Sequence, residues 1–173
     1  MTVKRKPYTP HAYQDSALDH ILSGRRRALW AGMGLGKTVT TLTALHILEL
    51  TEPGPTLVLA PRRVAVSTWP DEAQKWDHLS DVEVSVVVGT PEERRAALRR
   101  QAMVYTINYD NLPWLVEHCG LRWPFRKVVA DESTRLKSFR LRRGGIRARA
   151  LAKLAHCKID RFIELTGTPS PNG

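Results

Sequence analysis

Short apolar runs alternate along the chain with stretches in which apolar residues recur every three or four positions. This alternation predicts strands separated by helices, which is typical of an α/β fold with a largely parallel sheet. The predicted strands cover residues 28–31, 56–60, 82–88, 103–107, 127–130 and 162–165. The predicted helices cover residues 11–23, 37–50, 91–100, 109–118 and 146–156, together with a stretch after Pro61 that is interrupted at Pro70 and ends near Trp76.

The composition fits one globular domain. The chain has 173 residues, of which 42% are hydrophobic and 25% charged. No apolar run approaches the roughly 18 residues that a membrane helix needs, and the basic start lacks the apolar core of a secretory signal. Cys119 and Cys157 lie far apart without Cys-x-x-Cys spacing, and no histidines have metal-ligand spacing. We therefore expect a single domain in a reducing compartment, without a disulfide or a zinc site.

The formal net charge is +10, and most of the excess lies in one segment. Residues 135–153 contain eight Lys or Arg and no acid, whereas the rest of the chain holds 19 basic and 17 acidic residues. A basic excess favours polyanionic partners, above all nucleic acid. Arg140, Arg142, Arg143 and Arg147 are the candidate phosphate contacts in this segment, and a solvated helix face is the alternative.

A glycine-rich turn stands between a predicted strand and a predicted helix, in the sequence Ala31-Gly32-Met33-Gly34-Leu35-Gly36-Lys37-Thr38. Glycines let backbone N–H groups approach phosphate oxygens closely, and the helix that follows directs its positive end at the same place. The Lys37 ammonium can reach the outer phosphates of a nucleotide, and the Thr38 hydroxyl can ligate Mg²⁺. We therefore predict that residues 32–38 bind ATP with Mg²⁺, although Ala31 replaces the first glycine of the strict pattern.

Two acids follow the predicted strand at residues 127–130. We expect this strand to lie beside the one that precedes the glycine-rich turn, so that the two halves of a nucleotide site meet. Asp131 then holds Mg²⁺, usually through water, and Glu132 orients and deprotonates the attacking water. With Lys37, these acids are the predicted catalytic residues. A strand that ends in two acids is common by chance, so the upstream loop is what makes the prediction specific.

Five motifs in one order resemble the first RecA-like lobe of a superfamily 2 helicase or translocase of the DEAD/DEAH-like kind, closest to the Swi/Snf-type ATPases of phages or bacteria. They are Met33-Gly34-Leu35-Gly36-Lys37-Thr38; Leu57-Val58-Leu59-Ala60-Pro61 followed by Trp69, Glu72 and Lys75-Trp76; Tyr105-Thr106-Ile107-Asn108-Tyr109-Asp110; Asp131-Glu132-Ser133-Thr134-Arg135-Leu136-Lys137-Ser138; and Leu165-Thr166-Gly167-Thr168-Pro169 followed by Asn172. They span nearly the whole chain. Thr134 stands where the family usually has His, which puts the coupling role of that position in doubt.

The resemblance implies a three-layer α/β/α RecA-like P-loop fold and two more groups of site residues. Gln14, in a segment similar to the family's Q motif, is expected to read the adenine edge, and Tyr8 to stack on the base. A plain helix-surface role is the alternative for Gln14. Thr166, Gly167 and Thr168 are expected to couple the hydrolysis site to DNA and to a second lobe, with a plain strand-to-loop turn as the alternative.

Other residues of the same motifs have less determined roles. Arg62 and Arg63 follow a predicted strand and are candidate contacts to DNA phosphates. Trp69 and Trp76 fit core anchors better than base-stacking residues.

The resemblance implies the ATP-binding lobe of a DNA-dependent ATPase that couples hydrolysis to movement on DNA, with double-stranded DNA as the expected partner. The chain stops just after the last motif, so residues 1–173 are expected to be lobe 1, and the second RecA-like lobe, which normally supplies an arginine finger in cis, is absent from it. We expect the isolated lobe to be monomeric and cytoplasmic, in a bacterium or a phage-infected host, and to bind ATP but turn it over poorly. Two alternatives stay open: an RNA helicase lobe, and a nucleotide-gated nucleic-acid-binding module without turnover.

Overall fold

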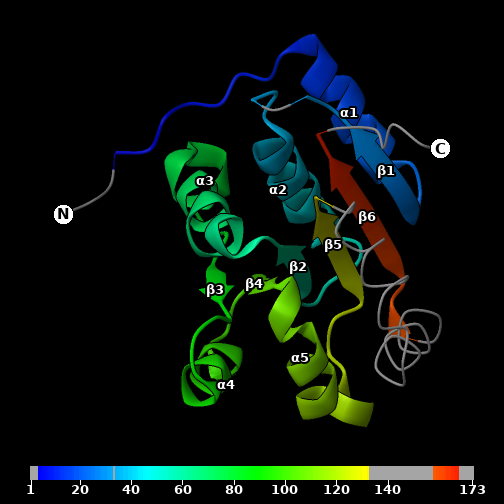
Figure 1. Cartoon of the computed structure of the whole chain (residues 1–173). Coiled ribbons are helices and arrows are strands. Elements are labelled where there is room, and N and C mark those ends of the chain that lie inside the picture. Colours follow the sequence, from blue (N-terminus) through cyan, green and yellow to red (C-terminus); the bar gives the residue numbers. More distant parts are fainter. Residues whose placement is uncertain (1–3, 33, 133–157, 168–173) are drawn as a thin grey trace.

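The computed structural model describes residues 4–32, 34–132 and 158–167, and a six-stranded sheet forms its centre (Figure 1). The strands are β1 (Arg26–Trp30), β2 (Thr56–Ala60), β3 (Val84–Val86), β4 (Val104–Asn108), β5 (Lys127–Asp131) and β6 (Arg161–Thr166). The α-helices are α1 (Ala12–Leu22), α2 (Lys37–Leu48), α3 (Trp69–Lys75), α4 (Pro91–Arg99) and α5 (Leu112–Cys119), joined by a π-helical turn η1 (Val64–Thr68) and the 3₁₀ turns η2 (Asp77–Leu79), η3 (Tyr109–Asn111) and η4 (Gly120–Arg122).

Some predictions fall outside the described residues. They concern the helix at 146–156 and the positions Met33, Thr134, Arg140, Arg142, Arg143, Arg147, Cys157 and Thr168. Within the described residues, no helix is long and apolar enough to cross a membrane.

The sheet separates two hydrophobic cores. In the fully buried strand β2, Val58 and Ala60 face the core that α1, α2 and α3 cover, whereas Leu57 and Leu59 face the core that α4 and α5 cover. Side chains that alternate between two buried faces are typical of a parallel sheet with helices on both sides. All strand pairs in the described part are parallel, so the predicted three-layer α/β/α architecture is confirmed.

One prediction about the sheet is wrong, because β5 does not lie beside β1. The strand order is β1-β6-β5-β2-β4-β3, with β1 at one edge in blue and β3 at the other in green (Figure 1). β6 pairs with both neighbours, placing Trp30 opposite Thr166 and Asp131 opposite Leu165. Because the strands are parallel, the ends of β1, β6 and β5 still meet at one edge, which we call the carboxyl edge.

The helical segment after Pro61 runs through Pro70 instead of breaking there. The Trp69 N–H donates to the Val64 carbonyl, so the π-helical turn η1 leads directly into α3. Pro70 is the second residue of α3, directly after this turn, so its missing N–H falls where the hydrogen-bonding pattern already changes. The sequence predicted an interruption, and the structure shows a local change of helix type.

Two buried basic residues pair with acids at the opposite edge of the sheet, which we call the amino edge. Arg161, the first residue of β6, is only 4% exposed and donates to both carboxylate oxygens of Glu52, at 2.8 and 2.9 Å. This pairing holds the pKa of Glu52 below its usual value. Lys127, the first residue of β5, is likewise buried and donates to Glu49 at 3.0 Å. Both strands therefore begin at a buried basic residue that pairs with a partly exposed carboxylate.

Glu52→Gln is expected to lower the free energy of unfolding by about 2 kcal/mol at neutral pH, because the buried Arg161 guanidinium loses its charged partner. The pKa of Glu52 is lower in the folded chain than in the unfolded chain, so its stabilisation is present above the unfolded pKa and is lost as pH falls through the folded pKa. Urea unfolding at a series of pH values should show the difference from wild type shrinking on acidification.

The matched control for this change is Glu92→Gln, which removes the exposed Glu92–Arg95 pair on α4. It should cost less than about 0.5 kcal/mol. Equal losses in the two variants would contradict a special role for the Glu52–Arg161 pair.

Candidate nucleotide-binding site

The turn between β1 and α2 has the backbone geometry of an anion site. Gly34 and Gly36 have φ angles of +79° and +72°, in the left-handed region that favours glycine. Gly36 is the N-cap of α2, and a Cβ added there would lie 2.3 Å from the amide nitrogen of Gln14. The backbone conformation therefore favours glycine at position 36, and a side chain there would also displace the end of Gln14. The first N–H groups of α2, which have no acceptor within the helix, point into this turn.

The Lys37 side chain folds back over the same turn. Its Nζ donates to the carbonyl oxygens of Ala31 at 2.6 Å and Gly32 at 2.8 Å. The ammonium is therefore held at the mouth of the loop, beside the start of α2. A phosphate at this helix end would meet both the helix N–H groups and the lysine charge.

A cleft of about 420 Å³ opens next to this turn. It brings together six of the residues predicted to bind the nucleotide: Tyr8, Gln14, Gly34, Gly36, Lys37 and Thr38. The end of η1 and α3 form another wall, which the sequence analysis did not assign to the site, with Thr68, Glu72, Lys75 and Trp76. Thr68, Glu72 and Lys75 recur at helical spacing, which is the pattern that indicates such a wall, and Trp76 follows directly after α3.

Gln14 ties α1 to the glycine-rich turn. Its Oε1 accepts from the His11 N–H at 2.9 Å, as part of a capping box, and its Nε2 donates to the Leu35 carbonyl at 3.4 Å. An amide side chain has two donors and two acceptor lone pairs, so each end keeps capacity for a further partner. The contact between Gln14 and adenine stays a prediction, and its support of the turn is an additional role.

Tyr8 is packed into the wall of the cleft. Its ring stacks on His78 with a centroid distance of 4.6 Å and meets the edge of Trp76 at 5.2 Å. The segment before it is anchored where Arg5 donates to the carbonyl oxygens of Ala73 and Trp76, at 2.7 and 2.9 Å. Burial raises the pKa of the Tyr8 hydroxyl. One ring face is thus covered by protein, and stacking on a base stays a prediction.

Asp131 ends β5 at the carboxyl edge and is buried, with 8% of its surface exposed. Its Oδ2 accepts a hydrogen bond of 3.0 Å from the indole N–H of Trp69. Burial raises the pKa of the Asp131 carboxyl, while the hydrogen bond from Trp69 and the Lys37 ammonium oppose that rise. Asp131 and the glycine-rich turn after β1 lie at the same edge of the sheet, with the end of β6 between them.

Glu132 differs from its neighbour in exposure and backbone. It is exposed, and its φ angle of +54° is the only positive one among non-glycine residues in the described part of the chain. Such a conformation costs about 1 kcal/mol or more and is concentrated at functional sites. The strain at Glu132 therefore coincides with the residue predicted to be the general base.

Thr166 occupies the position between the two halves of the site. It is the last residue of β6, is buried, and accepts the Ala31 N–H at its carbonyl oxygen at 3.2 Å. Gly167 follows directly. This placement joins the last of the five motifs to the glycine-rich turn through the backbone, and the coupling role of Thr166 and Gly167 stays a prediction.

The remaining predicted residues lie around this edge. Arg62 and Arg63 are exposed where the chain leaves β2, so they are accessible to a partner. The prediction that Trp69 is a core anchor is confirmed, because it is fully buried. Trp76 is half-buried, lines the cleft, and donates its indole N–H to Glu72 at 2.7 Å.

The donors present fit a nucleotide with Mg²⁺. Thr38 offers a hydroxyl at the start of α2 and Asp131 a carboxylate at the end of β5. No group of three or more His, Cys, Asp or Glu side chains that could hold a metal ion occurs within the described ranges. Mg²⁺ in phosphate sites uses one or two side chains, with waters and phosphate oxygens as the other ligands, and this donor set matches that pattern.

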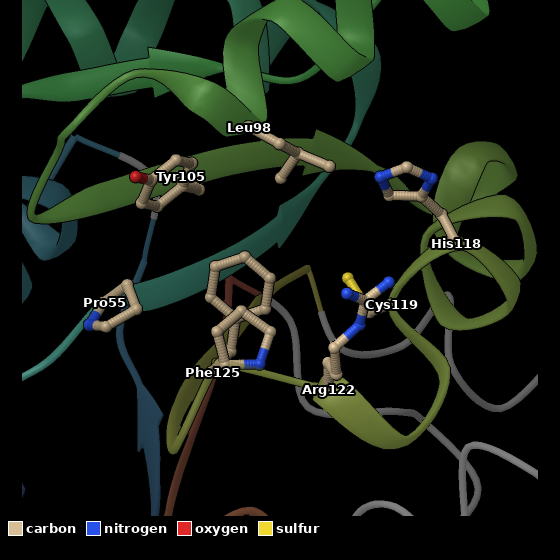
Figure 2. Close-up of a pocket in the computed structure, with 8 residues that line it drawn as sticks. Pro55, Leu98, Tyr105, His118, Cys119, Arg122 and Phe125 are labelled. Carbon is tan, nitrogen blue, oxygen red and sulfur yellow. The ribbon is translucent and has the colours of Figure 1, made fainter.

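A second hollow, of about 290 Å³, is lined by residues near the amino edge of the sheet, where Pro55 precedes β2 and Phe125 precedes β5 (Figure 2). Tyr105 and Phe125 supply aromatic surface there, and His118 and Cys119 reach it from α5. Burial raises the pKa of the Cys119 thiol, so it stays protonated at neutral pH. None of the predicted nucleotide-binding residues lines this hollow.

Comparison with known proteins gives consistent matches. Protein p41 of Acyrthosiphon pisum secondary endosymbiont phage 1 is 58% identical over 171 residues, covering 97% of this chain and 37% of that protein. The ATP-dependent DNA helicase DDM1 of Arabidopsis thaliana is 29% identical over 150 residues, covering 81% of this chain and 18% of its own length. The chain therefore spans less than half of these relatives.

Comparison with solved structures also finds proteins of this kind. The SWI2/SNF2 ATPase core of Sulfolobus solfataricus, solved in complex with double-stranded DNA, superposes with a TM-score of 0.71 at 20% identity, over 99% of this chain and 35% of that one. This likeness establishes a RecA-like helicase lobe as the fold. The sequence profile described as the SNF2-related domain matches residues 13–173. With nearly its whole length matched, the chain belongs to the SNF2-related domain family.

Proposed function

We propose that this chain is the ATP-binding lobe of a DNA-dependent ATPase that couples hydrolysis to movement on DNA. The observation that carries the proposal is that Lys37 and Thr38 line a 420 Å³ cleft at the carboxyl edge of the sheet, and that β5 ends in Asp131 at the same edge. Asp131 and Glu132 do not line the cleft itself. Membership of the SNF2-related family supports it, as does the ATP-dependent DNA helicase among the relatives.

In this proposal the nucleotide phosphates lie at the start of α2. The helix N–H groups and the Lys37 ammonium neutralise their charge, while Thr38 and Asp131 hold Mg²⁺ against them. When bound, the ion would neutralise the charge that develops on the phosphate oxygens during transfer. Glu132, exposed beside the buried Asp131, accepts a proton from the attacking water at its carboxylate.

Movement on DNA requires contacts to the DNA and a second lobe, in addition to the nucleotide site. We propose that Arg62 and Arg63 contact DNA phosphates and that residues 1–173 act as lobe 1, with a second RecA-like lobe in cis that supplies an arginine to the transition state. The share of the compared proteins that this chain covers, 37% of the phage relative and 35% of the SWI2/SNF2 core, leaves room for such a lobe. The chain alone is then expected to bind ATP and to hydrolyse it very slowly.

Lys37→Ala should weaken binding of ATP with Mg²⁺ by about 10- to 100-fold, because a charge-assisted contact to phosphate is lost. Isothermal titration calorimetry on the chain measures this directly. Lys4→Ala, which removes an exposed lysine before the cleft segment, is the control and should bind like wild type. Equal affinity in Lys37→Ala and wild type would overturn the assignment of the nucleotide site.

Glu132→Gln should keep ATP affinity within about threefold of wild type and lower turnover by about 10²- to 10⁴-fold in a protein that contains both lobes. The amide retains the shape of the side chain but cannot accept the proton. Glu117→Gln, at an exposed position on α5, is the control with unchanged turnover. Turnover of Glu132→Gln at the wild-type rate would refute the general-base role.

Arg62→Ala with Arg63→Ala should weaken duplex DNA binding and reduce the slope of log affinity against log salt by about two, one for each phosphate contact. Fluorescence anisotropy over a range of KCl concentrations gives that slope. The matched control is Arg99→Ala with Arg100→Ala, an adjacent exposed pair at the end of α4. An unchanged slope in the first pair, or tighter binding of single-stranded RNA than of duplex DNA by wild type, would contradict the proposed DNA contact.

A further inference from the structure

We infer that Trp69 and Tyr109 are positioning residues for Asp131, which fix its carboxylate in the place where it is proposed to hold Mg²⁺. The inference rests on the proposed function and adds residues that act through Asp131 without touching the nucleotide. Two aromatic donors from different motifs form hydrogen bonds to Asp131, one to its carboxylate and one to its backbone carbonyl. The Trp69 indole N–H donates to its side-chain Oδ2 at 3.0 Å, and the Tyr109 hydroxyl donates to its backbone carbonyl at 2.6 Å.

Both donor side chains, those of Trp69 and Tyr109, are rigid and shielded from water. Trp69 is fully buried, and Tyr109 is 9% exposed. Water therefore does not compete for Asp131 at these contacts, and the hydrogen bonds gain strength from their apolar surroundings. An aromatic ring with two side-chain torsions also loses little freedom when it holds a partner in place. The carboxylate is thus fixed before any ligand arrives.

The chemistry of the indole suits a support role. An indole N–H is only a donor, so it occupies one lone pair of Oδ2 and does not compete for a metal ion. A carboxylate has about four lone-pair sites, so sites remain for a ligand beside the bonds from Trp69 and from the Glu132 backbone N–H. Supporting hydrogen bonds of this kind orient metal-binding carboxylates, and losing one typically costs 10- to 100-fold in metal affinity.

Trp69 owes its direction to the π-helical turn before it. In η1 the Trp69 N–H bonds to Val64, five residues back, so the segment contains one residue more per turn than an α-helix. One extra residue rotates the rest of the helix by roughly 100° about its axis. The turn is anchored to the sheet where the Thr106 hydroxyl donates to the Ala65 carbonyl at 2.7 Å. A π-turn at this place is consistent with the frequent use of such turns at functional sites.

A second buried tryptophan shows that packing alone does not require a carboxylate partner. Trp123 is 6% exposed, and its indole N–H donates to the Phe125 backbone carbonyl at 2.8 Å. It lies in the other core, under α4 and α5. Trp69 and Trp123 therefore share burial and one short hydrogen bond, and differ in whether the acceptor belongs to the nucleotide site.

The test compares Trp69→Phe and Tyr109→Phe with the control Trp123→Phe in this chain. A fluorescent ATP analogue is bound at a fixed concentration, first with EDTA and then during a titration with MgCl₂. Trp69→Phe should keep the affinity for the metal-free analogue and raise the Mg²⁺ concentration at half-maximal effect by about tenfold or more. Tyr109→Phe, which removes one hydroxyl, should shift it in the same direction, and Trp123→Phe should leave it unchanged.

A spectroscopic measurement gives a readout independent of nucleotide. The Trp69 indole resonance in a ¹H–¹⁵N spectrum, identified by its loss in Trp69→Phe, should lose its protection from exchange in Asp131→Ala, while the Trp123 resonance stays protected. Unchanged exchange protection of the Trp69 indole in Asp131→Ala, or a Mg²⁺ midpoint equal to wild type in folded Trp69→Phe and Tyr109→Phe, overturns the positioning role. Failure of wild type to bind the analogue at all would instead refute the proposed function. If Trp69→Phe does not fold, the Mg²⁺ midpoint of Tyr109→Phe decides.

Discussion

The parallel direction of all six strands is the constraint on which the rest of the structure depends. Each described strand delivers its carboxyl end to the same edge, so residues as distant in sequence as Lys37 and Asp131 lie at one edge of the sheet. The insertion of β6 between β1 and β5 adds Thr166 to that edge and links it to the glycine-rich turn through the Ala31 N–H. A site of this kind needs no long loop, because the sheet itself brings the groups together.

Stabilising ion pairs lie at the amino edge of the sheet, whereas energetically costly features lie at the carboxyl edge. At the amino edge, buried Arg161 and Lys127 find carboxylate partners, which ties the first residues of β6 and β5 to the segment after α2. The carboxyl edge holds the less favourable features, a buried carboxyl at Asp131 and a left-handed backbone at Glu132. Such features persist only where neighbouring groups hold them in place, as the Trp69 indole N–H does for the Asp131 carboxylate.

Local patterns made the strands, the helices and the glycine-rich turn predictable from the sequence, because hydrophobic period and glycine spacing act over a few residues. The lateral place of β6 was not predictable, since a strand's neighbours depend on crossovers that leave no local pattern. The same holds for the bond from Trp69 to Asp131, which joins residues 62 positions apart. Pro70 misled the prediction because the sequence shows the missing donor but not the π-turn that accommodates it.

The most direct test of the account is a titration of the ¹⁵N-labelled chain with a non-hydrolysable ATP analogue and Mg²⁺, followed by backbone amide shifts. The account predicts the largest shifts at Gly34, Gly36, Lys37 and Thr38, with further shifts at Asp131 and Glu132 across the edge. Amides around the second hollow, such as those of His118 and Phe125, should stay in place. Shifts confined to the second hollow, or none at saturating nucleotide, would contradict the claim that the carboxyl edge of the sheet is a nucleotide site.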